Sequence, residues 1–154
     1  MREIKFRVKI KGDAGIYKVW QIDWLNQRVY AYRACGYEWV PFNKIQSLMQ
    51  WTGLRDCKRT EEYPEGQDIY ESDIVKGNIT SYGENDIGII KFGSHEVDNS
   101  GCEYSAISCV GWFIKLVDCA SYYSYNGHFN TNRFEVIGNI YQNKELLTCE
   151  TEVN

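Results

Sequence analysis

Leu48–Gly77 reads LMQWTGLRDCKRTEEYPEGQDIYESDIVKG and separates two parts of the chain that have different patterns. The part before it is rich in aromatic residues, and the part after it is strand-like and punctuated by glycines. Residues 57–67 are polar and contain Pro64, which predicts a surface loop. Gly53 predicts a position that needs a positive φ angle or a close backbone approach. We therefore expect the fold to be organised around this passage.

The first forty residues predict an antiparallel meander. In the first segment, Ile4, Phe6 and Val8 alternate with lysine and arginine, which is the period of a half-buried strand. Four strands are predicted in this way, at residues 3–10, 17–24, 28–35 and 37–40. The apolar spacing of residues 42–49 fits either a short helix or a strand that leads into the central passage.

The second half predicts a small barrel. Ile69–Val75 ends in Asp-Ile-Val, and Gly88–Gly93 follows with the pattern Gly-x-Ile-x-Phe. This combination is typical of the opening of SH3-like barrels. Asp73 is interpreted as a turn or capping carboxylate that accepts backbone N–H groups. Further elements are predicted as a polar connection at 95–103, strands at 104–117 and 134–141, and a hairpin turn at Asn126-Gly127.

The predicted fold class is therefore mainly β, with little helix: an antiparallel N-terminal meander and a C-terminal SH3-like small barrel. Residues 1–50 form the expected N-terminal aromatic β region. Residues 51–147 form the expected barrel region, and residues 148–154 form a polar tail. In the central passage, Gly53 and Asp73 are expected to fix turns, while Trp51 and Ile74 enter the cores.

The composition describes a globular domain. Hydrophobic residues make up 44% and charged residues 25% of 154, which excludes a disordered or fibrous chain. No apolar run approaches the roughly 18 residues that a membrane-spanning helix needs, and the N-terminus has no signal-peptide pattern. We expect a cytoplasmic protein that has no membrane partner.

Catalytic and metal-binding patterns are missing from the sequence. There is no phosphate-binding glycine loop, GxSxG or HExxH, and His95 and His128 both lie in predicted loops. A nucleophilic pair of Cys119 and His128 would lack a third residue to orient it. The six cysteines have no CxxC pair and are interpreted as free thiols: Cys35, Cys57, Cys102, Cys109, Cys119 and Cys149. We expect no enzyme activity, no cofactor and no catalytic, cofactor-binding or metal-binding residues, and no pattern identifies the binding residues.

Charge and aromatic content leave two kinds of partner open. The net charge is −4, yet the first 33 residues hold eight basic and three acidic residues. Alternating cations are typical of the solvent face of a strand, and a nucleic-acid surface is the alternative. The 12 tyrosines and 5 tryptophans suit protein interfaces or base stacking, although their period-two spacing also fits a sheet core.

Four segments of the chain resemble the YopX family of phage and prophage proteins. They are Met1–Arg7 (MREIKFR), Leu48–Asp56 (LMQWTGLRD), Ile69–Lys76 (IYESDIVK) and Phe134–Tyr141 (FEVIGNIY). The resemblance implies a phage or prophage origin and an accessory role inside the bacterial host. The family has no established activity. Together with the composition, this predicts a non-catalytic protein-interaction or self-associating module; the alternative is a nucleic-acid-binding small-barrel protein.

Two departures from the family pattern fall in the central passage. The loop at residues 57–67 is longer and more acidic than the family's Asp-Lys-Asn-Gly-type turn. Ser72 stands where the family has glycine in a Glu-Gly-Asp turn. That turn must therefore avoid a positive φ angle or tolerate one at a cost on the order of 1 kcal/mol.

Overall fold

Strands dominate the structure, a computed structural model that describes residues 3–79, 85–98, 106–117 and 131–147. The strands are β1 (Phe6–Ile10), β2 (Ile16–Asp23), β3 (Arg28–Arg33), β4 (Gly36–Pro41), β5 (Ile45–Arg55), β6 (Asp68–Tyr70), β7 (Asp73–Gly77), β8 (Asp86–Asp98), β9 (Ala106–Leu116) and β10 (Phe134–Asn139). Short 3-10 helices are η1 (Phe42–Lys44), η2 (Thr131–Arg133) and η3 (Lys144–Leu147). The mainly β class is confirmed. The predicted Asn126-Gly127 turn and the tail at 148–154 lie outside the described residues.

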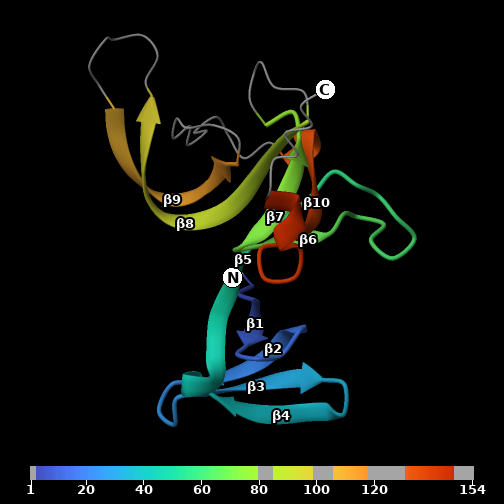
Figure 1. The fold of residues 1–154 in the computed structure, drawn as a ribbon, viewed down its shortest axis with the longest axis vertical. Coiled ribbons are helices and arrows are strands. Elements are labelled where there is room, and N and C mark those ends of the chain that lie inside the picture. The colour runs from blue at the N-terminus through green and yellow to red at the C-terminus, as the bar shows by residue number, and fades with distance from the viewer. Residues whose placement is uncertain (1–2, 80–84, 99–105, 118–130, 148–154) are drawn as a thin grey trace.

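The strands form two antiparallel sheets. One sheet has the order β4-β3-β2-β1-β5-β6, and the other has the order β10-β7-β8-β9. Figure 1 shows β1–β4 at one end of the molecule and β7–β10 at the other, with β5 running between them. The predicted four-strand meander is confirmed. The SH3-like barrel and the domain division after residue 50 stay predictions.

Residues 45–49 form a strand because β1 offers a complete pairing partner. Val8 pairs with Leu48, and Arg7 pairs with Met49, whose side chain is fully buried. Only the three residues of η1 are helical between β4 and β5. Of the two alternatives for this segment, the strand is the correct one.

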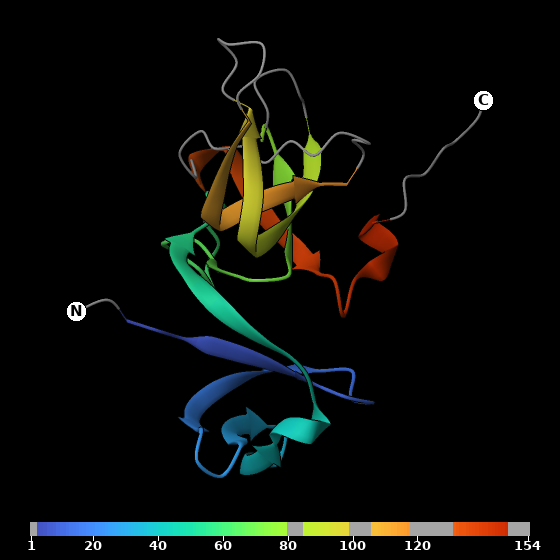
Figure 2. The ribbon, with the colours of Figure 1, turned by 90° about the vertical axis from the view of Figure 1, so that its left-hand side faces the viewer.

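Strand β5 links two separate hydrophobic cores. Leu48 packs against the N-terminal core, which includes Val8, Val29 and other β1–β4 residues. Leu54 packs against the C-terminal core, whose buried members are Ile69, Val75, Ile79, Ile90, Ile114, Leu116, Phe134 and Val136. The pairing of β5 with β6 shifts register between Trp51 and Arg55. Figure 2 shows the two ends of β5 in different parts of the molecule.

Predictions for individual residues of the central passage are mostly confirmed. Gly53 has the predicted positive φ angle, 89°, but it does not fix a turn: it lies inside β5, where the register of that strand shifts. Ile74 is fully buried, as expected. Trp51 is only half-buried and belongs to neither core, so its assignment to a core is wrong. Its indole N–H instead donates to the Leu54 carbonyl at 3.1 Å.

The second predicted polar connection, at residues 95–103, is partly wrong. Strand β8 continues to Asp98 because β9 pairs with it without interruption from Gly88–Leu116 to Asp98–Ala106. Cross-strand hydrogen bonding therefore outweighs the polar composition of residues 95–98. Among the described residues, no helix has the length and apolar character needed to cross a membrane.

Ser72 adopts a strained backbone conformation, with a φ angle of 68°. Its N–H donates to Ile90 O at 2.8 Å, and its carbonyl accepts from Ile140 N at 3.1 Å, so neighbouring strands hold the turn in place. We expect Ser72→Gly to raise the free energy of unfolding by about 0.5–1 kcal/mol, because glycine adopts this conformation without strain. Urea denaturation measures the change. Ser72→Ala keeps the Cβ atom and should give no gain; a gain as large as that of glycine would contradict the strain explanation.

Candidate functional site

A buried polar cluster joins the two sheets. Asp73, which is 1% exposed, accepts a hydrogen bond from Tyr70 N at 2.8 Å and another from Asn139 Nδ2 at 3.0 Å. The guanidinium of Arg7 on β1 forms an ion pair with the same carboxylate. Three segments that are distant in sequence therefore meet at one side chain. The predicted capping role of Asp73 is confirmed, and its ion pair with Arg7 was not predicted.

Met49, on β5, is the fourth member of this cluster. The Asn139 amide lies 3.6 Å from Met49 Sδ, and both residues are buried. Each of the four segments that resemble the YopX family contributes one residue to this cluster: Arg7, Met49, Asp73 or Asn139. The contacts of Asp73 with Arg7 and Asn139, and of Asn139 with Met49, therefore bring the four segments together.

Burial controls the ionisation of this cluster. Desolvation raises the pKa of Asp73, while the charge of Arg7 and the hydrogen bonds from Asn139 and Tyr70 oppose this rise. The Arg7 guanidinium lies over the Tyr70 ring, 4.0 Å from its centroid, which adds a cation–π contact. Burial, followed by the negative charge of Asp68, raises the pKa of Tyr70 to about 12.

The raised pKa of Tyr70 predicts a loss of stability in alkali. An unfolded tyrosine titrates near pH 10, so between about pH 10 and 12 the folded state keeps a proton that the unfolded state has lost. The stabilising contribution is complete below pH 10 and decreases as the pH rises toward 12. Tyr70→Phe should remove a difference of up to about 2–3 kcal/mol in this range. Urea unfolding from pH 8 to 11.5 tests this, with Tyr32→Phe as the same substitution at an exposed position. Identical alkaline slopes for Tyr70→Phe and wild type would contradict the prediction.

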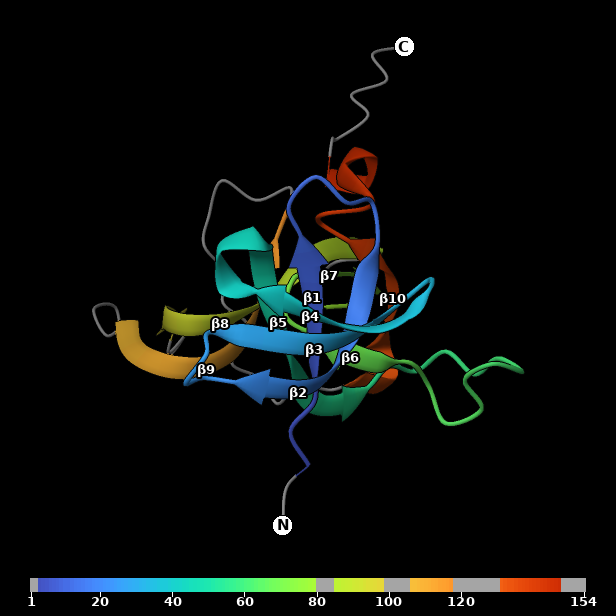
Figure 3. The same cartoon turned by 90° about the horizontal axis from the view of Figure 1, so that it is seen from below.

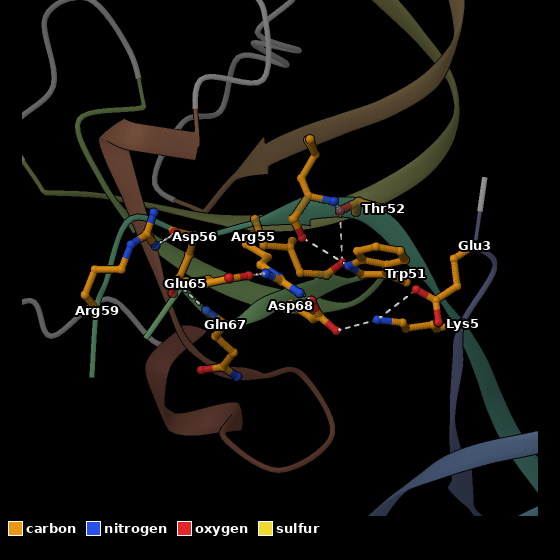
Figure 4. Close-up of polar contacts among 12 residues, drawn as sticks. Glu3, Lys5, Trp51, Thr52, Arg55, Asp56, Arg59, Glu65, Gln67 and Asp68 are labelled. Carbon is orange, nitrogen blue, oxygen red and sulfur yellow. Dashed lines mark hydrogen bonds and ion pairs between the residues drawn. The ribbon is translucent and has the colours of Figure 1, made fainter. Parts of the chain in front are cut away.

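Charged side chains connect β1, β5 and the loop before β6 (Figure 4). Asp68 accepts from Lys5 Nζ at 3.4 Å and from Arg55 Nε at 3.1 Å, and Arg55 also pairs with Glu65. The Lys5 ammonium lies 4.3 Å from the centroid of the Trp51 ring. This network attaches the acidic loop to the six-stranded sheet.

Asp56 closes the base of that loop and was missed in the sequence. It is 2% exposed, and its carboxylate accepts from Gln67 N at 2.8 Å and from Val136 N at 2.9 Å. The loop therefore begins and ends at one buried side chain, which also holds β10. The only available signal was an aspartate before a polar loop, and that pattern is common on protein surfaces.

Two depressions border Arg7. A groove of about 290 Å³ lies beside the loop, and Lys18, Glu62, Tyr63 and Tyr70 are among its lining residues. A second depression of about 210 Å³, also bordered by Arg7, is lined by residues that include Asp73, Asn139 and Gln142. Figure 3 shows the loop projecting from the molecule next to β6. The groove has both acidic and basic walls, so its charge does not select one ligand class.

An exposed aromatic surface lies on β2, β3 and β4. We call it the aromatic face; its residues are Trp20, Tyr30, Tyr32, Tyr37 and Trp39. Trp20 is 75% exposed, Tyr32 55% and Tyr37 49%. Tyr37 is central, since its ring centroid lies 6.0 Å from that of Trp20, 5.3 Å from that of Tyr30 and 5.0 Å from that of Tyr32. The rings of Tyr30 and Trp39 have centroids 5.0 Å apart.

The position of this face corrects one interpretation of the aromatic pattern. Period-two spacing was consistent with side chains in a sheet core, but the core side of β3 carries Val29 and Ala31, which are fully buried. Alternation along the strand therefore directs Tyr30 and Tyr32 to the opposite side. The period fixes which residues share a face, and it does not say which face is covered.

Chemically reactive side chains are dispersed in the described part of the chain. Cys35 and Cys57 are exposed thiols, and Cys109 is half-buried on β9. No group of three His, Cys, Asp or Glu residues is placed to hold a metal ion in the described segments. The His95 ring stacks on Phe113, with centroids 4.7 Å apart. Cys102, Cys119, His128 and Cys149 lie outside the described residues.

Comparison with known proteins gives one match. The model of a family described as YopX protein matches residues 5–148, which is nearly the whole chain. No curated protein and no solved structure matches the chain. The four converging residues Arg7, Met49, Asp73 and Asn139 all lie within the matched region.

Proposed function

The chain belongs to the YopX family, and on this premise we propose that it is a phage or prophage accessory protein acting in the bacterial cytoplasm as a non-catalytic interaction module. The aromatic face is the observation that carries this proposal. Five large rings touch one another on one side of a sheet, and three of them are about half exposed or more. Contiguous exposed apolar surface is typical of a site that another molecule covers.

Protein association is the first use that this face supports. Tyrosine and tryptophan provide large contact areas with little loss of side-chain entropy, and they are enriched where protein interfaces have their strongest contacts. The partner would be a phage or host protein, or a second copy of the chain. Light scattering across micromolar concentrations tests the second copy: a mass that rises with concentration supports self-association, and a constant monomer mass removes it.

Nucleic-acid binding is the second use, and the charge of the first part of the chain favours it. Residues 3–47 hold eight basic and four acidic side chains, a net charge of +4, although the whole chain has a net charge of −4. The Arg28 guanidinium lies 4.2 Å from the centroid of the Trp39 ring. Basic residues interleaved with aromatic ones attract phosphates while the rings contact bases.

Affinity capture from phage-infected or prophage-induced host cells tests the module as a whole. The bait is the full chain, compared with a Trp20→Ala/Tyr32→Ala variant and with Phe92→Ala as a matched control. Phe92 is also well exposed, at 56%, but lies on β8 in the other sheet. Parallel samples with and without nuclease separate protein partners from nucleic acid. Capture that the aromatic-face variant loses and the control keeps supports the proposal, and equal capture by all three baits contradicts it.

A further inference from the structure

We infer that the aromatic face binds single-stranded nucleic acid by stacking unpaired bases on its rings. The inference rests on the proposed function, which makes this face the contact surface, and it adds the chemical class of the ligand. Three observations carry it: the packing of the rings, the cations beside them and the open shape of the sheet.

The rings form one contiguous aromatic cluster on this side of the sheet, and the planes of Trp20 and Tyr32 are inclined to that of Tyr37 by 70° and 60°. Tyr37 joins Trp20, Tyr30 and Tyr32 through centroid separations of 5.0–6.0 Å, and Tyr30 continues the surface to Trp39. Mutual contacts hold the rings in place before a ligand arrives, which reduces the entropy lost on binding. Base stacking on aromatic rings depends little on the nucleotide sequence, since every base has an aromatic face.

Cations lie along the same side of the sheet. Lys18 and Trp20 on β2 are both exposed, and Val19 between them packs against the core, so both lie on the side opposite the core. Lys18 pairs with Arg7 in register, and both line the groove that borders the sheet. Arg7 is already paired with the buried Asp73, so the exposed Lys18 provides the positive charge beside Trp20, where the phosphates of a bound strand would lie.

The acidic side chains near the face are already neutralised within the protein. Asp23 accepts from Arg28 Nε at 3.1 Å. Asp13 accepts from Arg33 Nη2 at 2.6 Å, and Glu38 forms an ion pair with the same arginine. Residues 3–47 have a net charge of +4, and two of these cations, Lys5 and Arg7, are paired with Asp68 and Asp73 outside this range. The positive charge that remains, including that of the exposed Lys18, favours a polyanion as the ligand.

Single strands fit this face better than duplexes do. Bases of a duplex are stacked on each other and show only their edges in the grooves, whereas bases of a single strand can expose their planes. The rings lie on the side of an open sheet, and β2, β3 and β4 are joined by short turns. Nothing among these strands and turns has the form of a helix that could enter a major groove.

Fluorescence anisotropy of the full chain tests the inference directly. The probes are labelled dT20, labelled rU20 and a 20-base-pair DNA duplex, each titrated at 20 mM and 200 mM salt. We expect binding of at least one single-stranded probe at low salt, at least tenfold tighter than the duplex and weaker at high salt. Trp20→Ala and Tyr32→Ala should each weaken it by about tenfold, and Lys18→Glu should weaken it and reduce the salt dependence. Phe92→Ala and Lys144→Glu are the matched controls and should bind like wild type.

The possible results separate this inference from the proposed function. Absence of single-strand binding at 20 mM salt, equal affinity for the duplex, or unchanged affinity of the Trp20 and Tyr32 variants would each overturn the inference. Protein capture that depends on Trp20 and Tyr32 would still support the interaction module in those cases. If the Trp20→Ala/Tyr32→Ala variant also captures partners as well as the wild type does, both proposals fail. Circular dichroism of each variant confirms that a loss of binding is not a loss of folding.

Discussion

Asp73→Ala is expected to lower the free energy of unfolding by about 3–5 kcal/mol, the largest effect of any single change proposed for this protein. The variant removes the buried partner of Arg7 and leaves that guanidinium largely buried without its counter-charge. It also removes the acceptor of Tyr70 N–H and Asn139 Nδ2. Urea denaturation followed by tryptophan fluorescence measures the loss.

Two comparisons show whether the buried position of Asp73 is responsible. Glu38→Ala breaks an ion pair between more exposed side chains and should cost less than about 1 kcal/mol. The double variant Arg7→Met/Asp73→Ala should lose less than the sum of its two single variants, because it leaves no buried charge without a partner. A loss below about 1 kcal/mol for Asp73→Ala would show that the cluster does not hold the two sheets together.

Asp56→Ala is expected to lower the free energy of unfolding by about 2–4 kcal/mol. The carboxylate accepts two backbone N–H groups, and its removal leaves Val136 N without an acceptor in a buried position and Gln67 N without one in a partly buried position. The effect should also be local: amide exchange at Gln67 and Val136 is expected to speed up more than exchange in β2 and β3. Hydrogen-exchange measurements at single-residue resolution test this pattern.

Two further variants provide comparisons for the stability loss of Asp56→Ala: a conservative change at Asp56 and a change at an exposed carboxylate. Asp56→Asn keeps one acceptor oxygen and should show an intermediate loss of stability. Glu65→Gln changes an exposed carboxylate in the same loop, whose side chain is 76% exposed, and should alter stability by less than about 0.5 kcal/mol. Equal stability of Asp56→Ala and Glu65→Gln would show that the loop closes without the buried carboxylate.

Local patterns were sufficient for much of the fold. Alternating side chains predicted the strands of the meander, and those strands pair with their sequence neighbours as expected. Gly53 was recognised because only a few residue types tolerate its φ angle of 89°. The extension of β8 to Asp98 could not be predicted in this way, because it depends on the partner strand β9 and not on its own composition.

The candidate site was less predictable than the strands. Asp73 was assigned to a turn from its local sequence, and that role is correct. Its partner Arg7 is 66 residues away, and the Asp56 bond to Val136 spans 80 residues. No local pattern encodes such contacts. The exposure of Trp20 and Tyr37 was unpredictable for a similar reason, since it depends on which side of the sheet the rest of the chain covers.

The sequence by itself determined the β class, the meander, the special backbone position of Gly53, the turn at Ser72, and the likeness of four segments to the YopX family. These properties follow from residue type, spacing and short-range backbone preference. Only the tertiary structure decided that the four segments meet through Arg7, Met49, Asp73 and Asn139, and that the aromatic side of the first sheet lies open. Burial and long-range pairing arise when distant strands pack together, so the free energy that selects them is not present in any single segment.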